Sequence, residues 1–133
     1  MKKKKVLMLF VLVIIIAGIF IGVKLINDLN AYKAQVDAIS ISDVDLSKIE
    51  DGVYTGYYDA KLVSAKVRVT VKNHRIESIE LTEHNNGRGK PAEIIPDKVV
   101  EAQSLDVDTV SGATSSSKVI LKAIENALNS ASQ

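Results

Sequence analysis

The sequence predicts an α+β protein, with a small antiparallel sheet packed by two helices and preceded by one transmembrane helix and a helical stalk. Three patterns predict it. An uncharged apolar run fills residues 6–23, apolar and polar residues alternate over 63–71, and apolar residues recur at helical spacing over 115–131. We therefore divide the chain into a basic flank (1–5), a membrane anchor (6–26), a stalk or linker (27–45) and a folded domain (46–133).

The N-terminal segment has the length and flanks of a membrane anchor. As a helix, the run of residues 6–23 spans ~27 Å, close to the hydrocarbon thickness of a bilayer. Four lysines precede it and Lys24 alone follows directly, which favours a cytoplasmic N-terminus and a domain outside the cytoplasm. A cleaved signal peptide begins in the same way. The retained anchor is favoured because the run exceeds a typical signal core and residues 25–29 contain no convincing cleavage site.

A helical stalk is expected to follow the anchor. Apolar residues recur there at three- and four-residue steps, which predicts a helix with one apolar stripe. The stripe comprises Leu25, Ile26, Leu29, Tyr32, Val36 and Ile39. It is thin, so we favour a solvated stalk over a surface that pairs with a partner helix. The mixed residues 41–51 are typical of a linker.

The first predicted strand covers residues 53–58, with Gly52 and Gly56 marking its start and middle. Alternation places Tyr54 and Tyr58 on one face of this strand and Tyr57 on the other.

Two further strands complete a predicted meander. The alternating residues 63–71 predict a half-buried antiparallel strand. Residues 72–75 predict a tight turn in which Asn73 tolerates positive φ. A third strand returns through residues 76–81, where the spacing of Ile76 and Ile79 indicates a bulge or a register shift.

The second half of the domain is predicted to be largely helical. Residues 84–91 have the composition of a loop, and Pro96 suits the first turn of a helix. Its core-facing residues would be Ile95, Val99, Val100 and Ala102. Val107 and Val110 would pair with the sheet as a short edge segment. The last helix, residues 115–131, would bury Ile120, Ile124, Ala127, Leu128 and Ala131, with Val119 and Ala123 at the border of that face.

Composition excludes several classes of function. The chain has no cysteine, which excludes disulfides, cysteine-ligated zinc, iron–sulfur clusters, c-type haem and a lipoprotein anchor. It has no basic stripe with interleaved aromatics, so nucleic-acid binding is not expected. The two histidines lack the spacing of metal ligands, and no Ser-His-Asp arrangement or phosphate-binding P-loop is visible. We therefore predict neither a metal site nor catalytic residues.

The most informative segment runs from Asp108 to Ser115, with the sequence DTVSGATS. It places a Gly-Ala elbow between hydroxyl residues where the last helix begins. A helix start presents unpaired N–H groups and the positive end of the peptide dipole, which suits a phosphate. Thr114 at that position is a plausible acceptor for a phosphoester bond. Helix capping by Ser111, Thr114 or Ser115 is the ordinary alternative.

The pattern Asp108-x-x-Ser111-Gly112-Ala113-Thr114 resembles the acceptor motif of FMN-binding domains. These domains are related to the flavin-carrying subunits of sodium-pumping NADH:quinone oxidoreductase and of Rnf-type electron-transport complexes. The resemblance covers about residues 49–128 and implies that a flavin transferase joins the phosphate of FMN to Thr114. Ser111, Gly112 and Ala113 would form the elbow, and Asp108 would be read by the transferase.

Other residues are candidates for contact with the bound flavin. Ser115, Ser116 and Ser117 would supply hydroxyl donors, and Lys118 would offset phosphate charge from one turn inside the helix. His84 and Arg88 lie in a glycine-containing segment that could close over the isoalloxazine, and glycine neighbours would let Lys90 approach the flavin or its phosphate. A plain polar loop is the alternative for this segment.

The resemblance implies a membrane-anchored extracytoplasmic electron carrier with covalent FMN. Its partners would be the flavin transferase, a quinone-linked or flavoprotein donor in the membrane, an extracytoplasmic acceptor and the lipid bilayer. The chain is much shorter than the pump subunits, which favours a stand-alone carrier. Two alternatives stay open: a non-redox surface binding module, and a flavin-free regulatory subunit of a membrane complex.

Overall fold

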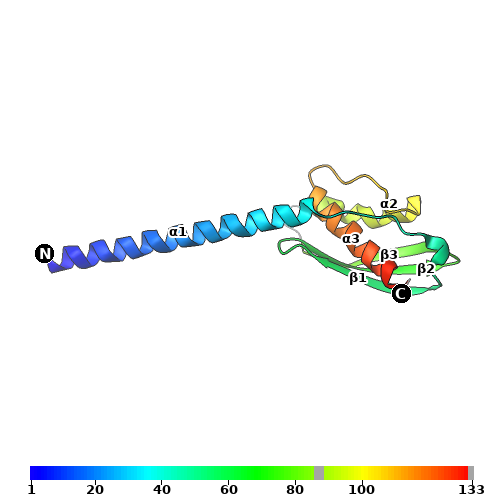
Figure 1. Cartoon of the computed structure of the whole chain (residues 1–133), viewed down its shortest axis with the longest axis horizontal. Coiled ribbons are helices and arrows are strands. Elements are labelled where there is room, and N and C mark those ends of the chain that lie inside the picture. Colours follow the sequence, from blue (N-terminus) through cyan, green and yellow to red (C-terminus); the bar gives the residue numbers. More distant parts are fainter. Residues whose placement is uncertain (86–88, 132–133) are drawn as a thin grey trace. The chain divides into compact units, whose positions relative to one another are not determined.

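The computed structural model of the chain describes residues 1–85 and 89–131 (Figure 1). The chain forms two compact units, Met1–Ala34 and Gln35–Gln133. The first is a stretch of one helix, and the second contains the sheet and the remaining helices. The second unit therefore includes residues 35–45, which the sequence assigned to a stalk or linker.

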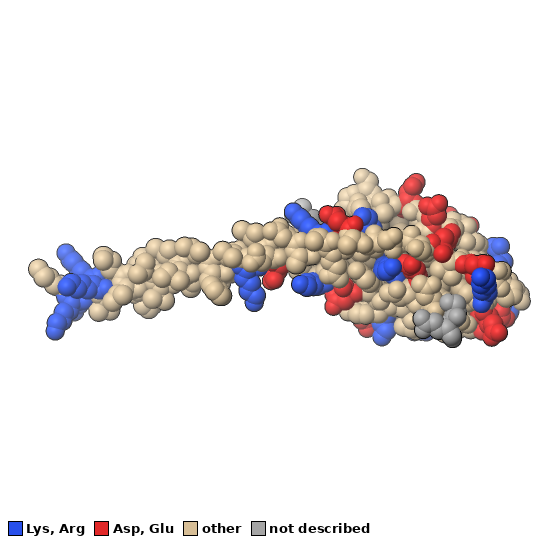
Figure 2. Space-filling view, viewed as in Figure 1, with Lys and Arg blue, Asp and Glu red and all other residues tan. Residues whose placement is uncertain are grey.

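Helix α1 (Lys2–Asp37) provides the first unit and contains a segment long and apolar enough to cross a bilayer. None of its most apolar 18-residue window is buried within the protein, and Phe20 is 76% exposed. Figure 2 shows this apolar stretch with lysines before it and after it. An exposed surface of this kind is costly in water and favourable in lipid. The helix ends at Asp37, two residues before the Ile39 that the predicted stripe included.

Three strands form the sheet of the second unit: β1 (Gly52–Asp59), β2 (Ser64–Lys72) and β3 (Arg75–Asn85). They are antiparallel in the order β1-β2-β3, which confirms the predicted meander. Alternation along β2 buries Ala65, Val67, Val69 and Val71 on one face. In β1 the register places Tyr54 opposite Val69 and Tyr58 opposite Ala65, whereas Tyr57 is half exposed on the outer face, as predicted.

The β2–β3 connection is a two-residue turn at Asn73 and His74, which have φ of 53° and 60°. Positive φ at both central residues is the mark of the hairpin turn whose twist matches the strands. The positive φ of Asn73 was predicted and that of His74 was not. The predicted bulge is confirmed, because Glu77 has no register partner between Ile76 and Ser78. A second register shift, at Thr82, was not predicted.

Helix α3 (Thr114–Ala131) packs on the buried face of the sheet against β1 and β2, and α2 (Ile95–Ala102) packs against β3 (Figure 1). This arrangement confirms the α+β class. A Cβ at Gly56 would lie 1.9 Å from the carbonyl oxygen of Ala123, so α3 touches the backbone of β1 itself. Beyond the predicted face, α3 also buries Ser116, Ser117, Leu121 and Glu125.

The structure corrects three predictions about the segments between β2 and α3. His84 and Asn85 lie in β3, and Lys90–Ile94 form a 3₁₀ helix, η2, so the described residues of 84–91 are in regular elements except Gly89. Val107 and Val110 belong to no strand among the described residues. The Val107 N–H donates to the carbonyl oxygen of Leu105, and the Val110 N–H donates to the buried hydroxyl of Ser117. Ala102 is exposed at the end of α2.

The linker between α1 and β1 packs onto the domain and contains a short 3₁₀ helix, η1 (Leu46–Lys48). Residues 35 and 36, the part of α1 that belongs to the second unit, also contact the domain: Val36 is buried, and the side-chain amide of Gln35 donates to the carbonyl oxygen of Asp59 at 2.8 Å. Lys122 on α3 donates to the carbonyl oxygen of Ser40 at 3.1 Å. The linker is therefore held to the domain at several points.

Candidate functional site

The site begins with a tight turn directly before α3. The N–H of Ala113 donates to the carbonyl oxygen of Val110 at 2.9 Å, and Gly112, the third residue of the turn, has φ of 79°. A type II turn requires positive φ at that position, which explains the glycine. Helix α3 begins two residues later, at Thr114.

Ser117 fixes this turn from inside the protein. Its hydroxyl donates to the carbonyl oxygen of Ala113 at 2.8 Å and accepts from the N–H of Val110 at 3.0 Å. The side chain is fully buried. The prediction that Ser117 donates to a phosphate was therefore wrong, because its proton is used within the fold. The sequence did not reveal this role, because a serine in the first turn of a helix is usually a polar residue at the surface.

Ser116 is also buried, and its hydroxyl forms a 3.0 Å hydrogen bond with Nε2 of His84. The Nδ1 atom of the same ring lies 3.1 Å from Oε1 of Glu93 on η2. A carboxylate can only accept, so Nδ1 of the ring donates to Glu93. The His84 side chain is 3% exposed. His84 thus connects β3, η2 and α3. The prediction that it lies in a surface loop was wrong, because it is part of β3 and its side chain is buried.

The surface of the turn presents Ser111, Gly112 and Thr114, with Ser115 partly exposed. Because the first α3 hydrogen bond runs from the Ser117 N–H to Ala113, the N–H groups of residues 114–116 precede the helical ladder. They have no hydrogen-bond partner among the residues that the structure describes. The exposed Thr114 therefore lies beside three N–H groups that have no hydrogen-bond partner in the described part of the chain, at the positive end of an 18-residue helix.

The remaining predicted residues lie in three different segments. Asp108 is exposed in the segment before the turn, and Lys90 is exposed at the first position of η2. Lys118 is partly exposed, one helical turn after Thr114. Arg88 lies outside the described residues. No group of three His, Asp or Glu side chains that could hold a metal ion is found in the described part of the chain.

A groove of about 360 Å³ lies beside the first turns of α3. Its walls come from the linker, from the segment between α2 and α3, and from α3 itself. It is lined by Ile39, Ile41, Asp43, Leu105, Asp106, Val107, Thr109, Lys118 and Leu121.

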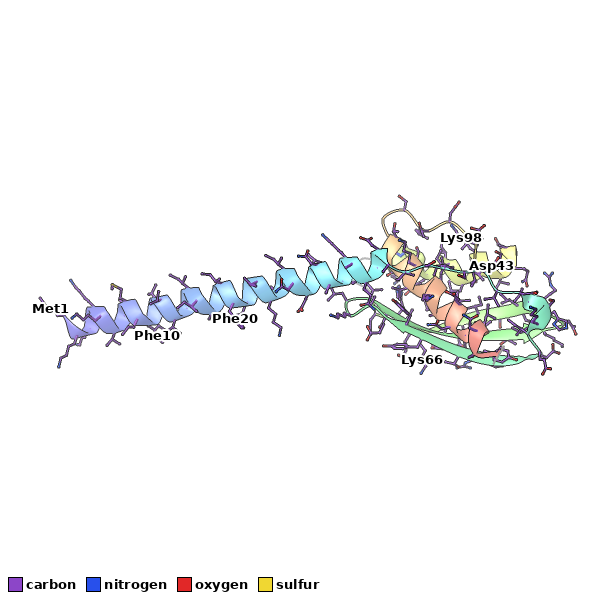
Figure 3. The ribbon with its side chains drawn as sticks, in the orientation of Figure 1. Met1, Phe10, Phe20, Asp43, Lys66 and Lys98 are labelled. Carbon is purple, nitrogen blue, oxygen red and sulfur yellow. The ribbon has the colours of Figure 1, made fainter. Side chains whose placement is uncertain are left out.

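Asp43 holds the linker wall of this groove against the segment that follows α2 (Figure 3). Its carboxylate accepts from the Ser104 hydroxyl at 2.5 Å and from the Leu105 N–H at 3.0 Å. Burial raises the pKa of Asp43, but the hydrogen bonds from Ser104, Leu105 and Val44 outweigh it, so the pKa is lowered from its ordinary value. The carboxylate is therefore the form that ties the two segments together.

Comparison with known proteins places these features in a family. The profile of the FMN-binding domain family matches residues 63–129, which include β2, β3, α2, the turn and nearly all of α3. The chain belongs to this family. The matched segment of this FMN-binding domain includes the exposed Thr114, the turn before it and the contacts of His84. The linker and β1 precede the matched segment.

Two relatives match the same share of the chain. A protein of Treponema pallidum (strain Nichols), described as uncharacterized, is 34% identical over 85 residues, which are 62% of this chain and 24% of the relative. The NADH:acrylate oxidoreductase of Vibrio harveyi is 33% identical over 85 residues, which are 62% of this chain and 8% of that protein. The chain thus corresponds to a small part of each of these longer relatives.

Proposed function

We propose that this FMN-binding domain carries FMN as a phosphoester on Thr114. The observation that carries the proposal is the exposed Thr114 at the start of α3, next to the N–H groups of residues 114–116, which have no hydrogen-bond partner among the described residues. An ester of this hydroxyl keeps a negative charge on its phosphate, which the helix N-terminus stabilises. The net change is the joining of the threonine hydroxyl to the FMN phosphate with loss of one water.

The chain's own residues position the acceptor. Gly112 forms the turn that precedes Thr114, and the buried hydroxyl of Ser117 holds that turn by hydrogen bonds to Val110 and Ala113. Lys118, one turn further, offsets the phosphate charge. FMN, when bound, supplies the redox chemistry, so the protein needs to hold and orient it rather than provide acid–base groups.

Covalent attachment also suits the charge of the domain. Residues 35–133 include 15 acidic and 11 basic residues, so the domain as a whole repels an anionic cofactor. In Figure 2 acidic side chains are spread over the visible face of this unit. A phosphate ester keeps the flavin in place without requiring a strongly basic pocket.

The proposed role is that of a membrane-anchored electron carrier on the outer side of the cytoplasmic membrane. The length and apolar surface of α1 support the anchor, and the lysines at residues 2–5 support a cytoplasmic N-terminus. A signal sequence meets the same length criterion, so retention of the helix is part of the proposal. A separate flavin transferase would load Thr114 and read Asp108. Electrons would come from a quinone-linked or flavoprotein donor in the membrane and leave to an extracytoplasmic acceptor.

The test is co-expression of the full chain with a flavin transferase. The wild type should be yellow, stay yellow after denaturation and gain the mass of one FMN less one water. Thr114→Ala should abolish this gain and Thr114→Ser should retain it. Thr109→Ala removes another exposed hydroxyl five residues earlier and should be loaded like the wild type. A colourless, unmodified wild type would overturn the proposal in favour of a flavin-free binding or regulatory module.

A further inference from the structure

Three polar side chains from three elements form one chain of hydrogen bonds at the start of α3. The Ser116 hydroxyl on α3 forms a 3.0 Å hydrogen bond with Nε2 of His84 on β3, and Nδ1 of His84 lies 3.1 Å from Oε1 of Glu93 on η2. Ser116 is 2% exposed, whereas the Glu93 side chain is 40% exposed. The hydrogen bonds therefore connect the interior of the domain to its surface.

Serine, histidine and a carboxylate in this order are also the residues of the hydrolase catalytic triad. A nucleophilic serine must be reached by its substrate, and the burial of Ser116 prevents this. A buried polar side chain that loses its partner is unfavourable, so the contact with His84 holds the backbone that carries Ser116 in place. The three residues therefore act on the position of the helix start.

The sheet determines where the His84 ring lies. His84 pairs with Ala65 of β2, and the side-chain amide of the next residue, Asn85, donates to the Ser64 hydroxyl at 3.2 Å. The end of β3 is thus held to β2 by backbone and side-chain contacts. The Glu93 carboxylate accepts from Nδ1, which orients the ring and directs Nε2 towards α3. The ring therefore gives α3 a fixed point on the sheet.

The first turn of α3 depends on such a fixed point. The N–H groups of residues 114–116 have no hydrogen-bond partner among the described residues, so they do not hold the helix start. Two buried serines hold it: Ser117 bonds to the preceding turn, and Ser116 bonds to His84. Thr114 lies in the same helical turn as both serines. Its position on the domain therefore depends on the contact with His84.

We propose that His84 is a positioning residue for the attachment of FMN to Thr114. Through Ser116 it keeps the Thr114 hydroxyl and the neighbouring N–H groups in the arrangement that receives the phosphate. This inference rests on the proposed function. In the attachment, the Thr114 oxygen bonds to phosphorus, a phosphoanhydride of FMN loses its leaving group, and that group takes the hydroxyl proton. His84 takes no part in these bond changes, but an acceptor misplaced by about 1 Å can lower a rate by about a hundredfold.

The first test compares two replacements of His84 in the full chain, loaded by the transferase. His84→Leu loses both of these hydrogen bonds, whereas the amide of His84→Gln can still bond to Ser116. The kcat for mass gain should fall at least about tenfold in His84→Leu and recover in His84→Gln. The KM for the protein should stay near its wild-type value, because the exposed residues around the turn, including Asp108, are unaltered.

His74→Leu is the matched control. Nδ1 of His74 forms a 3.0 Å hydrogen bond with the carbonyl oxygen of Ile49, in the turn before β3. His74 lies roughly 30 Å from His84 along the strand at about 3.3 Å per residue. The change removes a histidine hydrogen bond and places Leu at φ of 60°, so it destabilises the domain but should leave kcat unchanged. An equal loss of kcat in His74→Leu and His84→Leu would show that stability alone sets the rate, and would overturn the proposal.

Glu93 variants keep the test independent of how well the His84 variants fold, because Glu93 lies partly at the surface. Glu93→Ala removes the acceptor of Nδ1 and should lower kcat several-fold. Glu93→Gln keeps an acceptor oxygen and should recover kcat relative to Glu93→Ala. A wild-type kcat in every folded variant of His84 and Glu93 would end the positioning role.

Amide hydrogen exchange of the unloaded protein provides a readout without flavin. The Ser117 N–H donates to the carbonyl oxygen of Ala113 at 2.9 Å, in the first hydrogen bond of α3. Its exchange rate relative to that of Ile124, in the middle of the helix, should rise several-fold in His84→Leu and not in His74→Leu. An unchanged ratio in His84→Leu would show that His84 does not hold the helix start.

The mass of the wild type made with the transferase separates the two hypotheses. No added mass ends the proposed function and this inference with it. Added mass together with wild-type kcat in the His84 and Glu93 variants ends only the positioning role of His84.

Discussion

Replacement of Gly56 by alanine tests the closest contact in the domain. A Cβ at this position of β1 would lie 1.9 Å from the Ala123 carbonyl oxygen, 2.5 Å from the Ala127 nitrogen and 2.8 Å from the Ala127 Cβ. The first two atoms belong to the α3 backbone, so no side-chain rotation relieves the clash. Helix α3 must move away by roughly 1 Å or more, which opens voids along a close-packed interface.

The expected cost follows from this geometry. Overpacking a core usually costs about 1–3 kcal/mol, and we expect the upper end, about 3 kcal/mol, because two backbone segments are forced apart. In a domain of this size each kcal/mol lowers the melting temperature by roughly 4–8 °C, so a loss of more than about 10 °C is expected. Strand propensity acts in the opposite direction, since Gly in a strand interior is less stable than Ala by roughly 0.5–1 kcal/mol.

Gly52→Ala is the matched control in the same strand. Its Cβ would meet side-chain atoms only, the Tyr54 hydroxyl at 3.0 Å and Cζ at 3.2 Å, so the change should cost far less than Gly56→Ala. Unfolding of the full chain in detergent micelles is followed by tyrosine fluorescence, which is undisturbed because the chain has no tryptophan and β1 carries three tyrosines. If Gly56→Ala unfolds within about 1 kcal/mol of Gly52→Ala, the argument from backbone contact is refuted.

Three further predictions concern the turn and the linker. Gly112→Ala has open space around its Cβ but requires φ of 79°, so it should lose about 1–2 kcal/mol of stability and load FMN more slowly; a normal melting curve and loading rate would show that the turn does not need glycine. Ser117→Ala removes the hydroxyl that bonds Val110 and Ala113, and should cost about 1–3 kcal/mol in urea unfolding; an unchanged midpoint would contradict its role as a clamp. Asp43 has a lowered pKa in the folded protein, so the stability that it contributes is complete above its unfolded value of 3.8 and is lost as the pH falls through the folded value. The free energy of unfolding of the wild type, measured from pH 7 downward, should therefore fall in acid. Asp43→Asn should be less stable at neutral pH and should lose less free energy of unfolding as the pH falls. Parallel curves for the two proteins would contradict the role of Asp43 as a tether.

Much of the fold could be predicted because its signals are local. The alternation along β2 follows from the two faces of a strand, and the apolar spacing of residues 115–131 follows from the pitch of a helix. The bulge at Glu77 was visible as a three-residue step between Ile76 and Ile79. The elbow predicted at Ser111, Gly112 and Ala113 is a turn in which Gly112 has φ of 79°.

The wrong predictions concern residues whose backbone hydrogen bonds go to partners that are not their neighbours in the sequence. Val110 has the residue type of a strand, but its N–H bonds to Ser117 and not to the sheet. His84 lies among glycine, asparagine and charged residues that are typical of a loop, yet pairing with Ala65 extends β3 to include it. Neither partner is adjacent in the sequence, so no local pattern could have revealed the contact.

The sequence by itself therefore determined the apolar N-terminal helix, the strand order, the last helix and the hydroxyl motif that ends at Thr114. Each of these depends on periodicity or on residue type at neighbouring positions. Only the tertiary structure decided which hydroxyls remain at the surface, because burial of Ser116 and Ser117 depends on His84, Val110 and the packing of α3 on the sheet. It likewise brought the linker, residues 105–109 and Lys118 together around one groove, since hydrogen bonds between segments about 60 to 80 residues apart in the chain hold its walls.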